Sequence, residues 1–158
     1  MLTDPAASSL VARYRAGVRL VEEALAGADD AALDRRGPGP DAWCARQVVH
    51  HLADSETNSY VRLRRLLAEP APAVLQGYDE AHWAQVLHYD RPIAASLAVF
   101  RAVREASAEL LDTLSDDDLA RAGTHTDSGP YTLRDWLDIY AAHAEDHAAQ
   151  IREARGLA

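Results

Sequence analysis

Residues 43–68 read WCARQVVHHLADSETNSYVRLRRLLA, a segment in which apolar and small side chains recur at a helical spacing. The positions expected to face inward lie three or four residues apart: Val48, Leu52, Ser55, Ser59, Leu63 and Leu66. Asp41 is expected to cap the helix, and Pro70 ends it because proline cannot continue a helix. We therefore predict a helix from about residue 43 to residue 68, with small residues that favour a close neighbour or a cavity.

Three further segments carry the same periodicity. One follows Asp4 and Pro5 and ends near Gly27, one covers about residues 92–114, and one runs from the capping box at Thr132 to about Arg155. A long connection over residues 70–91 is expected to hold one helical turn. No runs typical of strands are present, and alanine, a strong helix former, is the commonest residue. The sequence predicts an all-α four-helix bundle with a long crossover, as a single domain over residues 1–158.

Charge and composition exclude several classes of function. The chain has 16 basic residues, all arginine, against 25 acidic ones, a formal net charge of −9. This balance disfavours a nucleic-acid or anionic-membrane surface. The one cysteine, Cys44, excludes an internal disulfide, and neither a signal peptide nor a long apolar run is visible. We expect a cytoplasmic protein that acts on a small molecule without nucleic-acid or membrane partners.

Three histidines are candidates for one metal site. His143 and His147 are four residues apart, so their imidazoles lie one above the other on a helix. About 0.3 such pairs are expected by chance, so the pair needs a third ligand to carry weight. At about 100° per residue, His51 falls at the edge of the inward stripe of its helix, while His50 points to solvent. His51, His143 and His147 could therefore converge. Ordinary hydrogen-bonded or solvated histidines are the alternative.

The motif Trp43-x-x-Arg46-Gln47-Val48-Val49-His50-His51-Leu52-Ala53-Asp54-Ser55 resembles the signature of the DinB-like superfamily, in its YfiT-like branch. The resemblance continues through Asn58-Ser59-Tyr60, Tyr78-Asp79-Glu80, His125, and Tyr140 with His143 and His147. It implies a four-helix bundle of the up-up-down-down type with a long crossover. It also implies a divalent metal, zinc or nickel, held by three histidines that fall here on His51, His143 and His147. Ala142, Asp146 and Gln150 depart from the histidine-rich pattern of the branch, which leaves the substrate open.

The resemblance implies an enzyme of one of two kinds. In the first, the metal holds a low-molecular-weight thiol of the bacillithiol or mycothiol type as a thiolate and presents it to an electrophile. In the second, a metal-bound hydroxide hydrolyses the substrate. Three neutral ligands with an open position suit both, and neither needs a protein nucleophile. A third possibility is a non-catalytic, metal- or ligand-binding stress-response protein. A homodimer is expected from the resemblance to dimeric relatives.

Six further residues are expected around the metal or at the mouth of the site. They are Asp54, Asn58, Arg62, His125, Tyr140 and Asp146. Ordinary surface positions explain Asp54 and Asp146 equally well, His125 could equally be a turn residue, and a solvated side chain is the more common role for an arginine such as Arg62. Asp54, Asn58 and Asp146, with Gln150, lie within a turn or two of a predicted ligand and could fix an imidazole through its second nitrogen. Arg62 could bind a carboxylate of the thiol, and His125 lies in the loop that enters the last helix.

Overall fold

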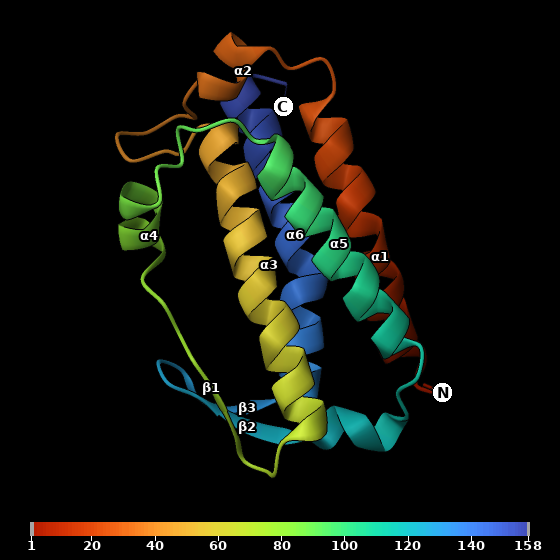
Figure 1. Cartoon of the computed structure of the whole chain (residues 1–158). Helices are drawn as coiled ribbons and strands as arrows, with labels where there is room; N and C mark the ends of the chain where they lie inside the picture. The colour runs from red at the N-terminus through yellow and green to blue at the C-terminus, as the bar shows by residue number, and fades with distance from the viewer. Residues whose placement is uncertain (1, 158) are drawn as a thin grey trace.

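Four long helices form the protein in the computed structural model, which describes residues 2–157 (Figure 1). They are α1 (Pro5–Leu25), α3 (Ala45–Ala68), α5 (Ala94–Leu111) and α6 (Leu133–Arg155). Short helices α2 (Asp30–Asp34), α4 (Glu80–Val86) and the 3-10 turn η1 (Asp116–Ala120) lie in the connections. The predicted four-helix bundle is confirmed. None of the helices in residues 2–157 is long and apolar enough to cross a membrane.

The helix ends follow from local capping. Asp4 accepts a hydrogen bond from the amide of Ala6 at the start of α1, as its position before Pro5 predicts. Thr132 and Asp135 form the predicted capping box of α6, which ends at Gly156 in the left-handed conformation. Asp41 was the wrong residue for the cap of α3. The helix begins at Ala45, and the amide of Cys44 donates to the side chain of Gln47.

The direction of the helices corrects the expected order. In Figure 1, α1 and α6 run one way and α3 and α5 the other, so the order is up, down, down, up and not up-up-down-down. Contacts agree, because His50 and Glu56 of α3 meet Ser96 and Arg104 of α5 in the same order along both helices. The long connection over residues 69–93 therefore joins two parallel helices, as a crossover must.

A small three-stranded sheet was missing from the prediction. Strand β1 (Ala73–Leu75) pairs in parallel with β2 (Ala122–His125), which pairs in antiparallel fashion with β3 (Gly129–Thr132). Strands of three or four residues with glycine and proline show no alternation that the sequence could reveal. The sheet lies at the end of the bundle where α6 begins, and it fastens the crossover there (Figure 1).

The bundle interior has two apolar clusters with a polar layer between them. One cluster includes Tyr14, Leu63 and Trp136, and the other includes Val48, Phe100 and Ile151. Between these positions along the helices lie buried Glu56 and Arg104. Gly17 allows α1 to approach this layer, because a Cβ there would lie 2.6 Å from the Cβ of Ala144 and 2.7 Å from the Arg104 guanidinium. The polar layer holds the candidate site.

Candidate metal centre

Three imidazoles from two helices converge at the polar layer. His51 projects from α3, and His143 and His147 project from successive turns of α6. One ring nitrogen from each lies within 4.8 Å of the others. The ring centroids are 5.5 Å apart for His51 and His143, 4.7 Å for His51 and His147, and 4.6 Å for His143 and His147. The predicted convergence of these three histidines is confirmed.

Burial keeps two of the three imidazoles neutral. Desolvation, reinforced by the neighbouring imidazoles His147 and His143, lowers the pKa of His51 to about 3. Desolvation and the proximity of His143 lower the pKa of His147 to about 4, although a hydrogen bond with Gln150 opposes the shift. Both rings are therefore neutral at pH 7. A neutral imidazole has one nitrogen with a free lone pair, which is what a metal ion requires.

Hydrogen bonds leave one nitrogen of each α6 histidine available. Nδ1 of His143 lies 3.0 Å from Oε1 of Glu56, and Nδ1 of His147 lies 2.7 Å from Oε1 of Gln150. Because carboxylate and amide oxygens accept, both Nδ1 atoms carry the proton and Nε2 is left for the site. His143 Nε2 has only a long contact, 3.4 Å, with the hydroxyl of Ser55.

His51 has no hydrogen bond to any residue in the described part of the chain, and its Nδ1 is a buried polar atom without a partner. The edge of Trp43 packs against this imidazole, with ring centroids 5.3 Å apart. Native structures seldom leave a buried polar atom unpaired, so this nitrogen requires an explanation. A divalent cation bound between the three histidines would account for the lack of partners on His51, since three imidazole nitrogens are a familiar donor set for zinc and related metals. The residues present therefore fit the metal that the sequence implied.

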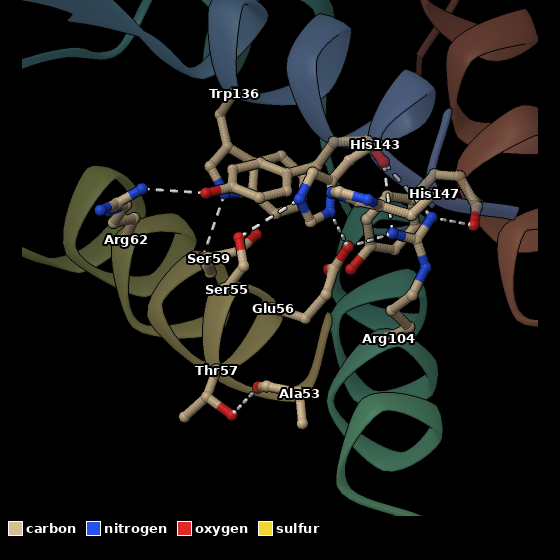
Figure 2. A network of polar contacts seen from close by, with 12 residues as sticks. Ala53, Ser55, Glu56, Thr57, Ser59, Arg62, Arg104, Trp136, His143 and His147 are labelled. Carbon is tan, nitrogen blue, oxygen red and sulfur yellow. Dashed lines mark hydrogen bonds and ion pairs between the residues drawn. The ribbon is translucent and has the colours of Figure 1, made fainter. Parts of the chain in front are cut away.

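An ion pair that the sequence prediction missed supports His143 (Figure 2). Glu56 is 1% exposed, and its Oε1 accepts from the guanidinium of Arg104 at 2.6 Å as well as from His143. Arg104, also 1% exposed, donates to the carbonyl oxygens of Tyr14 and Tyr140. All four long helices thus meet at one guanidinium. Arg104 stands one helical turn from inward-facing Phe100, which is the signal that could have found it.

Three of the predicted neighbours lie away from the imidazoles. Asp54 accepts from the hydroxyl of Tyr89, and Asn58 donates to the backbone oxygen of Asp54. Asp146 is exposed. Within residues 2–157, none of these three side chains has a hydrogen bond to a histidine of the centre. Gln150 is the residue that meets His147. Of the four candidates for this supporting role, the sequence analysis was right about Gln150 and wrong about Asp54, Asn58 and Asp146.

The other three predicted neighbours surround a cavity of about 240 Å³ beside His143. Its lining comes from α3, from α6, from the crossover with the start of α4, and from the hairpin of β2 and β3. The lining residues are Ser55, Arg62, Gly77, Tyr78, Glu80, His125, Asp127, Ile139, Tyr140 and His143. Arg62 donates to the Tyr140 hydroxyl at 2.9 Å and to the backbone of Gln76. Gly77 lets the carboxylate of Asp127 lie against the backbone at the rim, because a Cβ there would lie 1.7 Å from Oδ2 of Asp127. Arg62, His125 and Tyr140 therefore line a cavity beside His143, and their place at the mouth of a metal site stays a prediction.

His50 does not face solvent, contrary to the prediction from helical phase. It is fully buried, with Nδ1 2.7 Å from the hydroxyl of Ser96 and Nε2 2.9 Å from the carbonyl oxygen of Arg91. The end of the crossover and the start of α5 cover this side of α3. Both ring nitrogens are occupied, so His50 has no lone pair to offer a metal.

Comparisons with known proteins give a family and a similar fold. A family model described as the DinB superfamily matches residues 3–151. A protein of Oceanobacillus iheyensis named "Putative metal-dependent hydrolase" is 40% identical over 109 residues, which cover 69% of this chain and 63% of that relative. A protein of Halalkalibacterium halodurans with the same descriptive name is 32% identical over 114 residues, covering 72% and 66%. The chain thus spans slightly less than two thirds of these relatives.

A solved structure is similar over nearly the whole chain. YfiT from Bacillus subtilis, described as "a probable metal-dependent hydrolase with an unusual four-helix bundle topology", has a TM-score of 0.87 and 29% sequence identity. The similarity covers 98% of this chain and 88% of YfiT.

Proposed function

Because this chain belongs to the DinB superfamily, we propose that it is a metal-dependent enzyme whose divalent cation is held by His51, His143 and His147. The observation that carries the proposal is the convergence of one ring nitrogen from each of three histidines within 4.8 Å, with His51 buried and without a hydrogen-bond partner in residues 2–157. Three neutral donors leave the cation its full charge and room for another ligand, the arrangement of catalytic rather than structural sites.

When bound, such a cation lowers the pKa of a coordinated water or thiol and polarises a substrate carbonyl. The side chains of the cavity would orient the substrate. The Tyr140 hydroxyl accepts from Arg62, which leaves its own proton free to donate into the cavity. Burial raises the pKa of Tyr140, so that proton stays on the oxygen at neutral pH. Arg62 adds a positive charge beside it.

Hydrolysis is the reaction that the names of the relatives support. Proteins that are 40% and 32% identical carry the name metal-dependent hydrolase, and the description of YfiT includes the same words. A cavity of about 240 Å³ limits the part of the substrate that reaches His143 to a small group. We therefore infer hydrolysis of a small ester or amide as the first candidate reaction.

Transfer of a low-molecular-weight thiol is the second candidate, and one observation favours it. Among residues 2–157, Glu56 is the one carboxylate within hydrogen-bonding distance of the three histidines, and its Oε1 already accepts from Arg104 and His143. A carboxylate engaged in this way is a poor acceptor for a proton from water. A thiol, with a pKa of about 8.5, needs much less help than water to ionise.

Metal analysis is the first test. We expect wild-type protein to hold about one equivalent of zinc or nickel per chain and the His147→Ala variant to hold almost none. His82→Ala is the matched control, since His82 is exposed on α4 and should leave the metal content unchanged. Equal metal content in the wild type and His147→Ala would refute the proposal.

Substrate panels then separate the two reactions. If bacillithiol or mycothiol perturbs the visible spectrum of the cobalt-substituted protein and is required for turnover of a model electrophile, transfer is correct. If thiols leave the spectrum unchanged and esters or amides turn over alone, hydrolysis is correct. No turnover in either panel would contradict an enzymatic function and favour a non-catalytic metal-binding protein.

A further inference from the structure

The ion pair between Glu56 and Arg104 has a role beyond packing. A buried ion pair is costly to form, because both charges lose water, and apolar residues of similar size are often at least as stabilising. Here the pair occupies the layer between the two apolar clusters and touches one histidine of the candidate centre. Its position suggests that it serves the centre.

We propose that Glu56, held in place by Arg104, is a positioning residue that fixes the tautomer and orientation of His143. The inference rests on the proposed metal site, and it assigns to Glu56 a role that acts through His143 rather than by contact with the cation. The structure places Glu56 Oε1 3.0 Å from Nδ1 of His143. A carboxylate only accepts hydrogen bonds, so Nδ1 of His143 carries a proton, and in the neutral form of the ring the lone pair is left on Nε2.

Arg104 makes the buried carboxylate possible and holds it still. Its guanidinium supplies the compensating charge 2.6 Å from Glu56 Oε1. It is itself fixed by the carbonyl oxygens of Tyr14 and Tyr140, and it stacks over the Tyr14 ring with its central carbon 3.8 Å from the centroid. Because the guanidinium is anchored to three other helices, the carboxylate that it contacts has little freedom to move. His143 is therefore held from outside α6.

His147 offers a comparison within the same site. Its Nδ1 has Gln150 as partner, an uncharged amide on the same helix, three residues away. Hydrogen bonds to charged groups are roughly twice as strong as neutral ones, so Glu56 should restrain its imidazole more firmly than Gln150 does. Partners of this kind typically change metal affinity by about 10–100-fold when they are removed.

The decisive variant replaces both members of the pair. Glu56→Met/Arg104→Met removes the two charges together, and such a replacement usually preserves folding. We expect this double variant to bind zinc about 10–100-fold more weakly than the wild type in a chelator competition. Glu56→Gln keeps an oxygen acceptor for His143 and Arg104, and its amide nitrogen would take the place of Oε2, which has no partner in the described residues. The zinc affinity of Glu56→Gln should fall only a few-fold.

A readout that needs no metal separates this inference from the proposed function. Nitrogen NMR of metal-free protein should show His143 with its proton on Nδ1 in the wild type and in Glu56→Gln, and a mixture of tautomers in the double variant. Asp34→Asn is the control. It weakens the contact with Arg46, which is 6% exposed on α3, and should change neither the tautomer nor the zinc affinity.

Two results would overturn the inference. One is a His143 proton on Nε2 in the metal-free wild type, and the other is a folded double variant that binds zinc as tightly as the wild type. Should the double variant fail to fold, Glu56→Gln decides. A shifted His143 tautomer in this variant with an unaltered zinc affinity would show that the tautomer does not govern zinc binding, and would contradict the inference equally. A wild type that binds no zinc refutes the proposed function instead, while the tautomer measurement still decides the role of Glu56.

Discussion

Two adjacent residues of α3, His50 and His51, are both buried and are treated in opposite ways. On the side of α3 that faces α5 and the end of the crossover, both nitrogens of His50 have hydrogen-bond partners. On the side that faces α6, His51 has none among the described residues and its Nδ1 is buried. Burial therefore does not distinguish a structural histidine from a metal ligand. The hydrogen-bond partners of each ring nitrogen do distinguish them.

The largest effect that this contrast predicts is on metal affinity. His51→Ala removes one of three proposed ligands, and for comparison structural zinc in zinc-finger peptides binds with roughly 10–16 kcal/mol in total. We expect a loss of about 4 kcal/mol, or about a thousandfold, measured by competition with a chelator. His50→Ala should bind zinc like the wild type. If both variants lose zinc equally, the distinction between the two faces is wrong.

The second effect is a dependence of apoprotein stability on pH. The ordinary pKa of histidine is 6.5, and in the folded protein burial lowers it to about 3 for His51 and about 4 for His147. Below pH 6.5 the unfolded chain therefore binds more protons than the folded one, and stability falls as pH decreases toward 4.

We expect metal-free protein to lose about 4 kcal/mol of unfolding free energy between pH 7 and pH 5, measured by urea denaturation. The His51→Ala/His147→Ala double variant should show a much flatter profile. A wild-type profile as flat as that of the variant would show that these imidazoles are not held neutral by the fold.

The third effect concerns stability on the α5 side. His50→Ala leaves a cavity and strands two polar partners, the Ser96 hydroxyl and the Arg91 carbonyl. A loss of about 2–3 kcal/mol in unfolding free energy is expected, with zinc content unchanged. Thermal denaturation of this variant checks the expected loss of stability, and metal analysis of the same preparation checks that its zinc content is unchanged. Unchanged stability would mean that this histidine is not a structural one.

The smallest effect compares two serines that touch histidines. Ser96→Ala removes a 2.7 Å hydrogen bond to His50 and should cost about 1 kcal/mol. Ser55→Ala removes only a 3.4 Å contact with His143 and should cost less than about 0.5 kcal/mol, since hydrogen bonds at that length are weak. Urea denaturation of the two single variants gives the order, and the reverse order would contradict the contact geometry.

Much of the fold could be predicted from the sequence because helices leave local patterns of periodicity and capping residues. The inward stripe over Val48 to Leu66, the Thr132 capping box and Gly156 predicted helices that the structure contains. The convergence of the three histidines followed from helical phase together with family resemblance. In contrast, strand β1 has three residues and owes its existence to a partner 50 residues away, which no local pattern encodes.

The errors within the site share one physical cause. Helical phase distinguishes the two faces of a helix, but it does not say what covers the outer one. His50 was predicted to be solvated because the crossover that covers it comes from elsewhere in the chain. Glu56 and Arg104 were overlooked because charged residues are rarely buried unless paired, and the partner is 48 positions away.

The histidines lie on the long helices, whereas much of the cavity wall lies in the connections, and this separation affects how proteins of this fold can diversify. The three imidazoles project from the long helices α3 and α6. The opposite wall of the neighbouring cavity comes from the crossover and from the hairpin of β2 and β3, where Asp127 lies over Gly77. Exchanging those two loops would leave the three histidines in place and alter the shape and charge that an incoming molecule meets. Grafting them from one scaffold of this type onto another is thus a direct route to new selectivity without rebuilding the centre.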